Sequence, residues 1–323
     1  MIDRAETDAG RRASVLTTGH VPVGDGHQIY VETSGAIDGM PIVFLHGGPG
    51  SGCQTAHRQL FPKDAYLVMF DQRGAGRSLP KRSRADNTTD HLIADMEKLR
   101  AHFGIDKWIV AGGSWGATLA LAYAQRHPRH VIGMVMRSVF LGTHAELETA
   151  FCANLSMFYP NLHDDFLAML PDDERADPLG AYWAHILDAD AQHSRRFALA
   201  WHDTERILSQ IAPECTTLDP LRLDDPKVAL PASPFMEAYY FSHDCFLKDR
   251  PLLENATALA GIPGIIIQPR YDLLCPPATS HRLAARWPGV EIRVSSQAGH
   301  SLRDGETVGA MQRAIVDMIA RVS

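Results

Sequence analysis

The stretch Ala111-Gly112-Gly113-Ser114-Trp115-Gly116 decides the fold of this chain. It fits the pattern G-x-S-x-G, in which a serine on a strained turn between a strand and a helix presents its hydroxyl above the edge of a sheet. Glycines two residues before and after the serine let the helix and the strand approach closely. The apolar run 108–111 predicts a buried strand before the turn, and the Ala- and Leu-rich run 117–125 predicts a helix after it. The stretch therefore has the context that a nucleophilic serine requires.

Further strands and helices alternate around this turn. Apolar or alternating runs predict strands over 28–33, 41–45, 66–70, 131–136, 262–268 and 290–294. Apolar stripes at helical spacing predict helices over 90–103, over 278–286 and near the C-terminus from 308 to 319. Strands that alternate with helices predict a mostly parallel sheet with both faces covered.

The alternation stops in the middle of the chain. Apolar residues there recur at helical spacing, but prolines interrupt them repeatedly, which is typical of several short helices. We therefore expect one large α/β core in two parts, 1–137 and 251–323, with an all-helical cap inserted over 138–250. Residues 1–13 are expected to form a poorly ordered tail.

Composition excludes several classes of function. The chain of 323 residues has 31 basic and 38 acidic side chains, a net charge of -7, which argues against nucleic acid or an anionic membrane as a partner. Its five cysteines are scattered without a C-x-x-C pair, so we expect reduced thiols and no zinc site. Neither a signal-peptide pattern nor a run of about 18 apolar residues is present, and the expected location is the cytoplasm.

A glycine-rich loop follows the predicted strand 41–45. Its sequence, His46-Gly47-Gly48-Pro49-Gly50-Ser51-Gly52, lacks the G-K-[ST] ending of a phosphate-binding loop and the third glycine of a dinucleotide fingerprint. Glycines at this place let backbone N–H groups point at a developing negative charge. The loop is therefore interpreted as part of an oxyanion hole, with His46 ordering it.

Two further residues complete a candidate catalytic triad. Asp272 comes just after a late strand, and His300 lies in a glycine-flanked loop after the last strand. With Ser114 they give the chain order Ser, Asp, His, which is that of the α/β-hydrolase fold. Because His300 must be neutral to accept a proton from the serine, activity is expected to fall on the acid side.

Several motifs together resemble the proline iminopeptidases, which are serine peptidases with the α/β-hydrolase fold. The resemblance rests on His46-Gly47-Gly48-Pro49-Gly50, Asp71-Gln72-Arg73-Gly74-Ala75-Gly76-Arg77-Ser78, Asn87-Thr88-Thr89, Gly112-Gly113-Ser114-Trp115-Gly116 and Arg270-Tyr271-Asp272. It covers the core from about residue 20 to the C-terminus and is weaker through the cap. The chain departs from the family pattern near the pocket, at Ser138, Thr204 and the stretch 142–155.

The resemblance implies a set of site residues. Ser114 is implied as the nucleophile, His300 as general base and acid, and Asp272 as the group that orients the histidine. The backbone N–H groups of Gly47 or Gly48 and of Trp115 are implied as the oxyanion hole. In the cap, the resemblance implies Glu205 and Glu237 as ligands of the substrate's free amine, Arg137 as an organiser of ion pairs and Phe140 as a wall for the pyrrolidine ring.

The leading hypothesis is a serine exopeptidase that releases N-terminal proline through an acyl-enzyme on Ser114, without a metal or organic cofactor. Its expected partner is a small peptide or amino-acid amide with a free N-terminus, and the chain is expected to be a monomer or a small homo-oligomer. Two alternatives remain open. One is a carboxylesterase or small-molecule amidase with an altered cap pocket, and the other is a catalytically silent ligand-binding protein. Cys275, close in sequence to Asp272, is interpreted as a buried, inert thiol.

Overall fold

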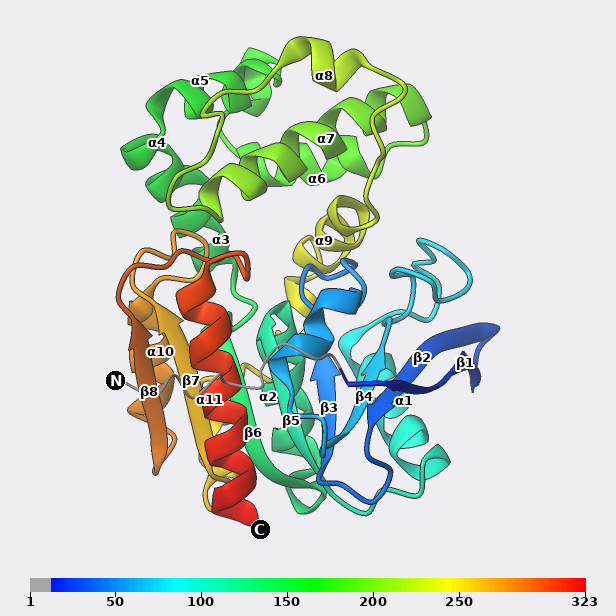
Figure 1. The fold of residues 1–323 in the computed structure, drawn as a ribbon. Helices are drawn as coiled ribbons and strands as arrows, with labels where there is room; N and C mark the ends of the chain where they lie inside the picture. The colour runs from blue at the N-terminus through cyan, green and yellow to red at the C-terminus, as the bar shows by residue number, and fades with distance from the viewer. Residues whose placement is uncertain (1–12) are drawn as a thin grey trace, which may run out of the picture.

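The computed structural model describes residues 13–323, and the predicted tail lies, apart from Ala13, outside the described residues. One sheet runs through the molecule with helices on both faces. A separate group of helices forms a cap above the end of the sheet, over the ends of its central strands (Figure 1). None of the helices in the described part of the chain is both long and apolar enough to span a bilayer.

The sheet has eight strands in the order β1-β2-β4-β3-β5-β6-β7-β8. Their bounds are β1 Val15–Gly24, β2 His27–Gly35, β3 Pro41–Leu45, β4 Tyr66–Phe70, β5 Trp108–Ser114, β6 Val131–Val139, β7 Gly264–Pro269 and β8 Val290–Ser295. The pairs β1/β2 and β2/β4 are antiparallel, and the other five pairs are parallel. The predicted α/β-hydrolase fold with a mostly parallel sheet is confirmed.

Strand β1 is the element that the sequence did not predict. Most of its residues are exposed, and Gly19 and Pro22 interrupt its sequence. A strand at the edge of a sheet that buries neither face has no alternating apolar pattern. The usual sequence signal is therefore missing at β1.

Side chains of the central strands alternate between two apolar layers. In β3, Val43 and Leu45 belong to the same cluster as the helices α1 (Thr89–His102) and α2 (Trp115–Arg126). Ile42 and Phe44 instead share a cluster with Met311 and Ile315 of α11 (Gly305–Val322). A continuous apolar run in a strand thus reports burial on both faces of the sheet.

The cap is a helical insertion between β6 and β7, as predicted (Figure 1). Its helices are α3 His144–Glu148, α4 Leu155–Phe158, α5 Pro160–Ala168, α6 Pro178–Ile186, α7 Ala191–Leu208, α8 Pro220–Asp224 and α9 Ser233–Phe241, with a π-helical segment over Thr149–Asn154. After the cap, α10 (Pro277–Ala284) lies between β7 and β8. The domain boundaries at 137/138 and 250/251 stay predictions.

The turn at Ser114 has the strained geometry expected from its glycines. Ser114 has φ 57° and ψ -127°, a conformation that side chains other than glycine rarely adopt. A Cβ atom on Gly112 would lie 2.7 Å from the carbonyl oxygen of Gly116, and one on Gly116 would overlap the carbonyl oxygen of Leu45. Close packing of α2 against β3 and β5 therefore holds Ser114 in this conformation.

Replacing Gly116 by alanine is expected to destabilise the protein by about 2 kcal/mol, in the range typical of overpacked sites. The added methyl group would meet backbone atoms of Leu45, which cannot rotate away. Chemical denaturation measures the change in the free energy of unfolding. Gly104→Ala provides a control. Nothing lies within 4 Å of the Cβ position at Gly104, so the added methyl group causes no overlap there, and the variant measures only the backbone strain of a φ of 65°. A Gly116→Ala loss no larger than that of the control would contradict the packing argument.

Candidate active site

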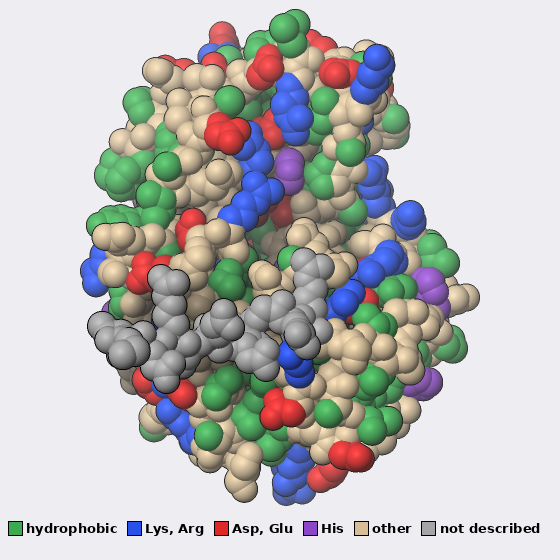
Figure 2. Space-filling model, viewed as in Figure 1, with side chains coloured by type: hydrophobic (Ala, Val, Ile, Leu, Met, Phe, Trp, Pro, Cys, Tyr) green, Lys and Arg blue, Asp and Glu red, His purple; other side chains and the backbone are tan. Residues whose placement is uncertain are grey.

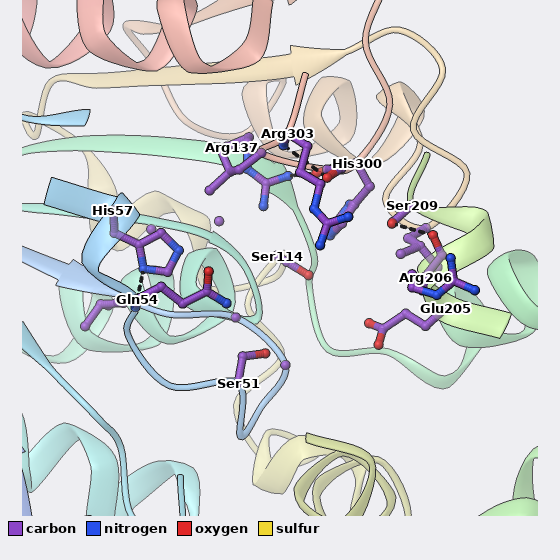
Figure 3. A pocket seen from close by; sticks show the side chains of 18 of the residues that line it. Ser51, Gln54, His57, Ser114, Arg137, Glu205, Arg206, Ser209, His300 and Arg303 are labelled. Atoms are coloured by element: carbon purple, nitrogen blue, oxygen red, sulfur yellow. Dashed lines mark hydrogen bonds between the residues drawn. The ribbon is translucent and has the colours of Figure 1, made fainter. Parts of the chain in front are cut away.

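Three residues far apart in the sequence meet below the cap. Ser114 ends β5, Asp272 follows β7, and His300 lies in the loop after β8. Nδ1 of His300 lies 3.0 Å from each carboxylate oxygen of Asp272. Ser114 and His300 line the same cavity (Figure 3). Because Nδ1 is engaged with Asp272, Nε2 is the ring nitrogen that remains for proton transfer.

The environment of Asp272 keeps it ionised. Its Oδ1 accepts hydrogen bonds from the backbone N–H groups of Leu274 and Cys275, at 3.1 and 2.8 Å. Burial by itself would raise the pKa of Asp272, but the charge of His300 and hydrogen bonds, including one from Ser138, outweigh burial and hold the pKa below its usual value. An ionised carboxylate in this position stabilises the imidazolium that forms during catalysis.

Ser138 is a positioning residue that sequence reasoning missed. It has φ 51°, and its Oγ also accepts a hydrogen bond of 2.8 Å from Nη1 of Arg137. The hydroxyl therefore links Arg137 to Asp272, although Asp272 lies more than 130 residues further along the chain. No local sequence signal could reveal this contact, and the sequence marked Ser138 only as a departure from a family pattern.

The glycine-rich loop is fastened beside Ser114. A Cβ atom on Gly47 would lie 3.7 Å from Cβ of Ser114, so the loop backbone passes next to the nucleophile position. Nε2 of His46 accepts from the backbone N–H of Gln72 at 3.0 Å, and Nδ1 donates to the carbonyl oxygen of Gly47 at 2.9 Å. Burial lowers the pKa of His46, in agreement with this neutral ring. The interpretation of His46 as the residue that orders the loop is confirmed.

Gln72 joins the loop to the turn at Ser114. Its side-chain amide donates to the carbonyl oxygen of His46 at 3.0 Å and accepts from Nε1 of Trp115 at 2.8 Å. Both the glycine loop and Trp115 are thereby held by one buried amide. Such a link fixes the relative positions of the backbone N–H groups that the sequence assigned to the oxyanion hole, those of Gly47, Gly48 and Trp115.

The cavity below the cap has a volume of about 310 Å³. Six of the ten predicted site residues line this cavity, namely Gly47, Gly48, Ser114, Arg137, Glu205 and His300. Asp272, Trp115, Glu237 and Phe140 are buried around it instead. His202, Arg206 and Arg303 line it as well and were not predicted.

Glu205 on α7 and Glu237 on α9 are close enough for the charge of one to act on the other. Oε2 of Glu237 accepts a hydrogen bond of 2.6 Å from Nε1 of Trp201, while its buried Oε1 has no partner among the described residues. Burial raises the pKa of Glu205 to about 7. Burial and then the charge of Glu205 raise the pKa of Glu237 well above its usual value. Two acids that repel each other in a dry site, one with an unused oxygen, favour a cation between them.

Arg137 and Phe140 have contacts different from those that their predicted roles suggest. Arg137 donates to Ser138 and to the carbonyl oxygen of His300, and it forms no ion pair within the described residues. The ring of Phe140 packs edge-on against Phe241, with centroids 5.9 Å apart. Arg137 therefore supports the loop of His300, and its function toward the glutamates stays a prediction, as does that of Phe140.

Ionisation of Glu205 is expected to oppose folding. A carboxyl whose pKa is raised by folding stabilises the protein below its unfolded pKa, near 4.5, and loses that contribution as the pH rises through about 7. Glu205→Gln should therefore raise the melting temperature at pH 8 by a few degrees and leave it nearly unchanged at pH 5. Thermal unfolding at both pH values tests this, with the exposed Glu254→Gln as control. Equal shifts of the Glu205→Gln protein at the two pH values would contradict the argument.

Two groups of side chains in the described residues place three metal-type ligand atoms within 4.8 Å of one another. One is Asp272, Cys275 and His300, in which Asp272 already binds His300 and burial raises the pKa of the Cys275 thiol well above its usual value. A thiol that stays protonated is a poor metal ligand. Cys275 is buried, as expected.

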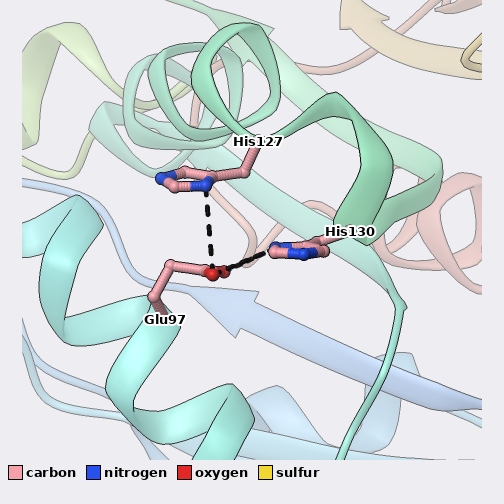
Figure 4. Close-up of side chains that lie close together, drawn as sticks. All are labelled: Glu97, His127 and His130. Atoms are coloured by element: carbon pink, nitrogen blue, oxygen red, sulfur yellow. Dashed lines mark hydrogen bonds and ion pairs between the residues drawn. The ribbon is translucent and has the colours of Figure 1, made fainter.

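The other group is Glu97, His127 and His130 (Figure 4). Arg100 binds Glu97 at 3.0 Å through two nitrogens, and the hydroxyl of Tyr123 donates to the same carboxylate at 2.6 Å. The two imidazole rings are stacked with planes 9° apart, and both face the Glu97 carboxylate, whose oxygens Arg100 and Tyr123 already engage. This group is a hydrogen-bond network that ties α1 to the end of α2.

Comparison with known proteins agrees with the fold and identifies the family. A family model described as alpha/beta hydrolase fold matches residues 40–303. A proline iminopeptidase from Neisseria meningitidis is 40% identical over 307 residues, which are 94% of this chain and 96% of that protein. One from Arabidopsis thaliana is 37% identical over 290 residues, 89% of this chain and 76% of that protein.

Solved structures share the fold at low sequence identity. The crystal structure of a Mycobacterium smegmatis proline iminopeptidase superposes with a TM-score of 0.63 at 15% identity, covering 95% of this chain and all of that one. An esterase from Exiguobacterium antarcticum reaches 0.65 at 17% identity, covering 94% of this chain and all of that one. Because both fold neighbours are distant, the sequence relatives decide the family. Because these relatives are 37% to 40% identical over most of this chain and a family model for the alpha/beta hydrolase fold matches residues 40–303, the chain belongs to the proline iminopeptidase family of α/β hydrolases.

Proposed function

We propose that this protein is a serine exopeptidase that releases N-terminal proline from short peptides, with Ser114, His300 and Asp272 as its triad. The observation that carries the proposal is the cavity that Ser114, His300 and Glu205 line together (Figure 3). Glu237 is buried with one oxygen that has no partner among the described residues, and the charge of Glu205 acts on it. A nucleophile close to a pair of carboxyls fits a substrate whose reactive carbonyl lies one atom from a charged amine.

The chemistry proceeds in two halves. Oγ of Ser114 attacks the carbonyl carbon of the prolyl residue while Nε2 of His300 takes the hydroxyl proton. The negative oxygen that forms is stabilised by the N–H groups of Trp115 and of Gly47 or Gly48. His300 then gives its proton to the departing amine, which leaves an ester on Ser114.

Water completes the second half. His300 takes a proton from a water molecule, the resulting hydroxide attacks the ester carbonyl, and proline leaves as the proton returns to Ser114. Throughout both halves the protonated amine of proline is held by Glu205 and Glu237. The binding of this cation lowers the pKa of both glutamates, because it compensates the repulsion between them.

Initial rates on a small panel of substrates test the proposal. Proline arylamide should be cleaved at least about tenfold more efficiently than alanine arylamide, since a pocket that fits one ring discriminates by one to two orders of magnitude. The acetate ester of the phenol with the same aryl group serves as the comparison substrate with an uncharged acyl group. A kcat/KM for proline arylamide that is below that for the ester and is unchanged by Glu205→Ala and Glu237→Ala would favour the carboxylesterase alternative.

A further inference from the structure

The side of the cavity where the leaving peptide must pass carries an unpaired arginine. His300 delivers the proton to the leaving amine, so the leaving group lies on the His300 side of Ser114 and away from the two glutamates. Arg303 lies three residues after His300 on the same loop and lines the cavity (Figure 3). Its side chain therefore borders the path of the leaving group.

The loop that carries Arg303 is fixed at several points. The backbone N–H of Ser301 donates to the carbonyl oxygen of Ser209 at the end of α7, at 2.9 Å. The N–H of Arg303 donates to Oγ of Ser301 at 3.1 Å, and that of Gly299 donates to Oδ2 of Asp304 at 2.8 Å. The backbone at Arg303 is thus held between cap and core, which reduces the entropy lost when its side chain binds a ligand.

The guanidinium of Arg303 has no ion-pair or hydrogen-bond partner within the described residues, although Asp304 is its neighbour in sequence. The carboxylate of Asp304 instead accepts the bond from the backbone N–H of Gly299. Among the described residues that line the cavity there are three arginines, Arg137, Arg206 and Arg303, and one acid, Glu205. Arg206 is engaged with Asp203 at 3.4 Å, and Arg137 is buried. Of the arginines that line the cavity in the described part of the chain, Arg303 is therefore the one whose guanidinium remains free to bind an anion from solution.

A second cavity continues outward from the first. It has a volume of about 590 Å³ and shares Gln54, His57, Leu60, Ser301, Leu302 and Arg303 with the cavity at Ser114. Figure 2 shows the hollow between cap and core, with Lys and Arg side chains along its edges and an acidic side chain inside it. Arg303 stands where the two cavities join, on the way from Ser114 to solvent.

We propose that Arg303 binds the C-terminal carboxylate of the substrate, so that the preferred substrates are proline dipeptides and tripeptides with a free carboxyl end. This inference rests on the proposed function, since it concerns the leaving part of a peptide. An arginine fork binds a carboxylate through two parallel hydrogen bonds. Each further residue moves the carboxylate by at most about 3.5 Å, so only short leaving groups place it beside Arg303.

Paired peptides that differ only at the carboxyl end test the proposal. Pro-Gly and Pro-Gly-Gly are compared with their C-terminal amides, and kcat/KM is measured by release of free proline. For at least one of the two peptide lengths, kcat/KM for the free acid should be about tenfold higher than for the amide. A ratio of this size is what one hydrogen-bonded ion pair contributes. Arg303→Gln should bring that ratio close to one, and Arg303→Lys should keep part of it. High ionic strength should reduce it in the unaltered protein.

The control is Arg129→Gln, an exposed arginine next to His130 and at the opposite end of α2 from Ser114. It should leave the acid-to-amide ratio as it is. Equal kcat/KM for acids and amides in the unaltered protein, or a preference that survives Arg303→Gln, would overturn the proposal while proline release itself still occurs. Failure to release proline from any of these peptides would instead contradict the proposed function.

Discussion

Replacing Ser114 by alanine is expected to lower kcat for proline release by at least about 10⁴-fold, as removal of the nucleophile does in other serine hydrolases. Without the hydroxyl no acyl-enzyme can form, and the remaining groups can only bind the substrate and polarise its carbonyl. Alanine is smaller than serine but shares its backbone preferences, so the strained turn with φ 57° is kept. Steady-state rates on proline arylamide, with the melting temperature measured alongside, provide the comparison.

Ser51→Ala is the matched control for this change, because Ser51 lines the same cavity but has no place in the proposed chemistry. It should stay within a factor of about three of the unaltered enzyme, since exposed substitutions without special contacts have small effects. Loss of a burst of arylamine in the Ser114→Ala protein would support the acyl-enzyme. Activity of that protein at the level of the control would show that another group is the nucleophile.

Glu237→Gln is expected to lower kcat/KM for proline arylamide by about 10²- to 10³-fold, which corresponds to the loss of one partner from a buried charge pair. The substitution keeps the size of the side chain and its ability to accept from Nε1 of Trp201. What it removes is the negative charge and the free acceptor oxygen that we propose as a ligand of the protonated amine. The loss should therefore be confined to substrates with a charged N-terminus.

An N-acetylated proline arylamide serves as the internal control for this prediction. It lacks the charge, so its low kcat/KM should change by less than about threefold in the Glu237→Gln protein. Glu254→Gln, at an exposed position, should alter neither substrate. Parallel losses for the free and the acetylated substrate would mean that Glu237 supports the fold of the cap and does not bind the amine.

The parts of the fold that can be predicted from the sequence are those in which the local residue types are compatible with only one kind of structure. Gly112 and Gly116 can be read from the sequence because a Cβ atom at either position would meet backbone. The strand Pro41–Leu45 is recognisable because it is buried on both faces. Strand β1 is not, because its exposed side chains leave no periodic pattern.

The parts of the site that escape prediction depend on contacts between distant segments. Gln72 and Ser138 are ordinary polar residues in sequence, and their importance lies in partners brought to them by the fold, Trp115 and Asp272. Arg303 likewise looks like any surface arginine after a histidine. Only the shared lining of two cavities shows where its side chain lies.

The cap is predictable as a set of helices but not as a binding site. A glutamate on a helix is most often exposed to solvent. The burial of Glu237 beside Trp201 follows from the packing of α7 against α9, which no helical pattern specifies. For that reason the cap glutamates came from a family resemblance, whereas the order of Ser114, Asp272 and His300 came from the residues themselves.

The central claim is that a serine hydrolase site is joined here to a site for a free amine. The ratio of kcat/KM for proline arylamide to that for its N-acetylated form tests this claim most directly. We expect a ratio of at least about 10², set by the binding of one cation by two buried carboxyls. A ratio close to one would contradict the claim.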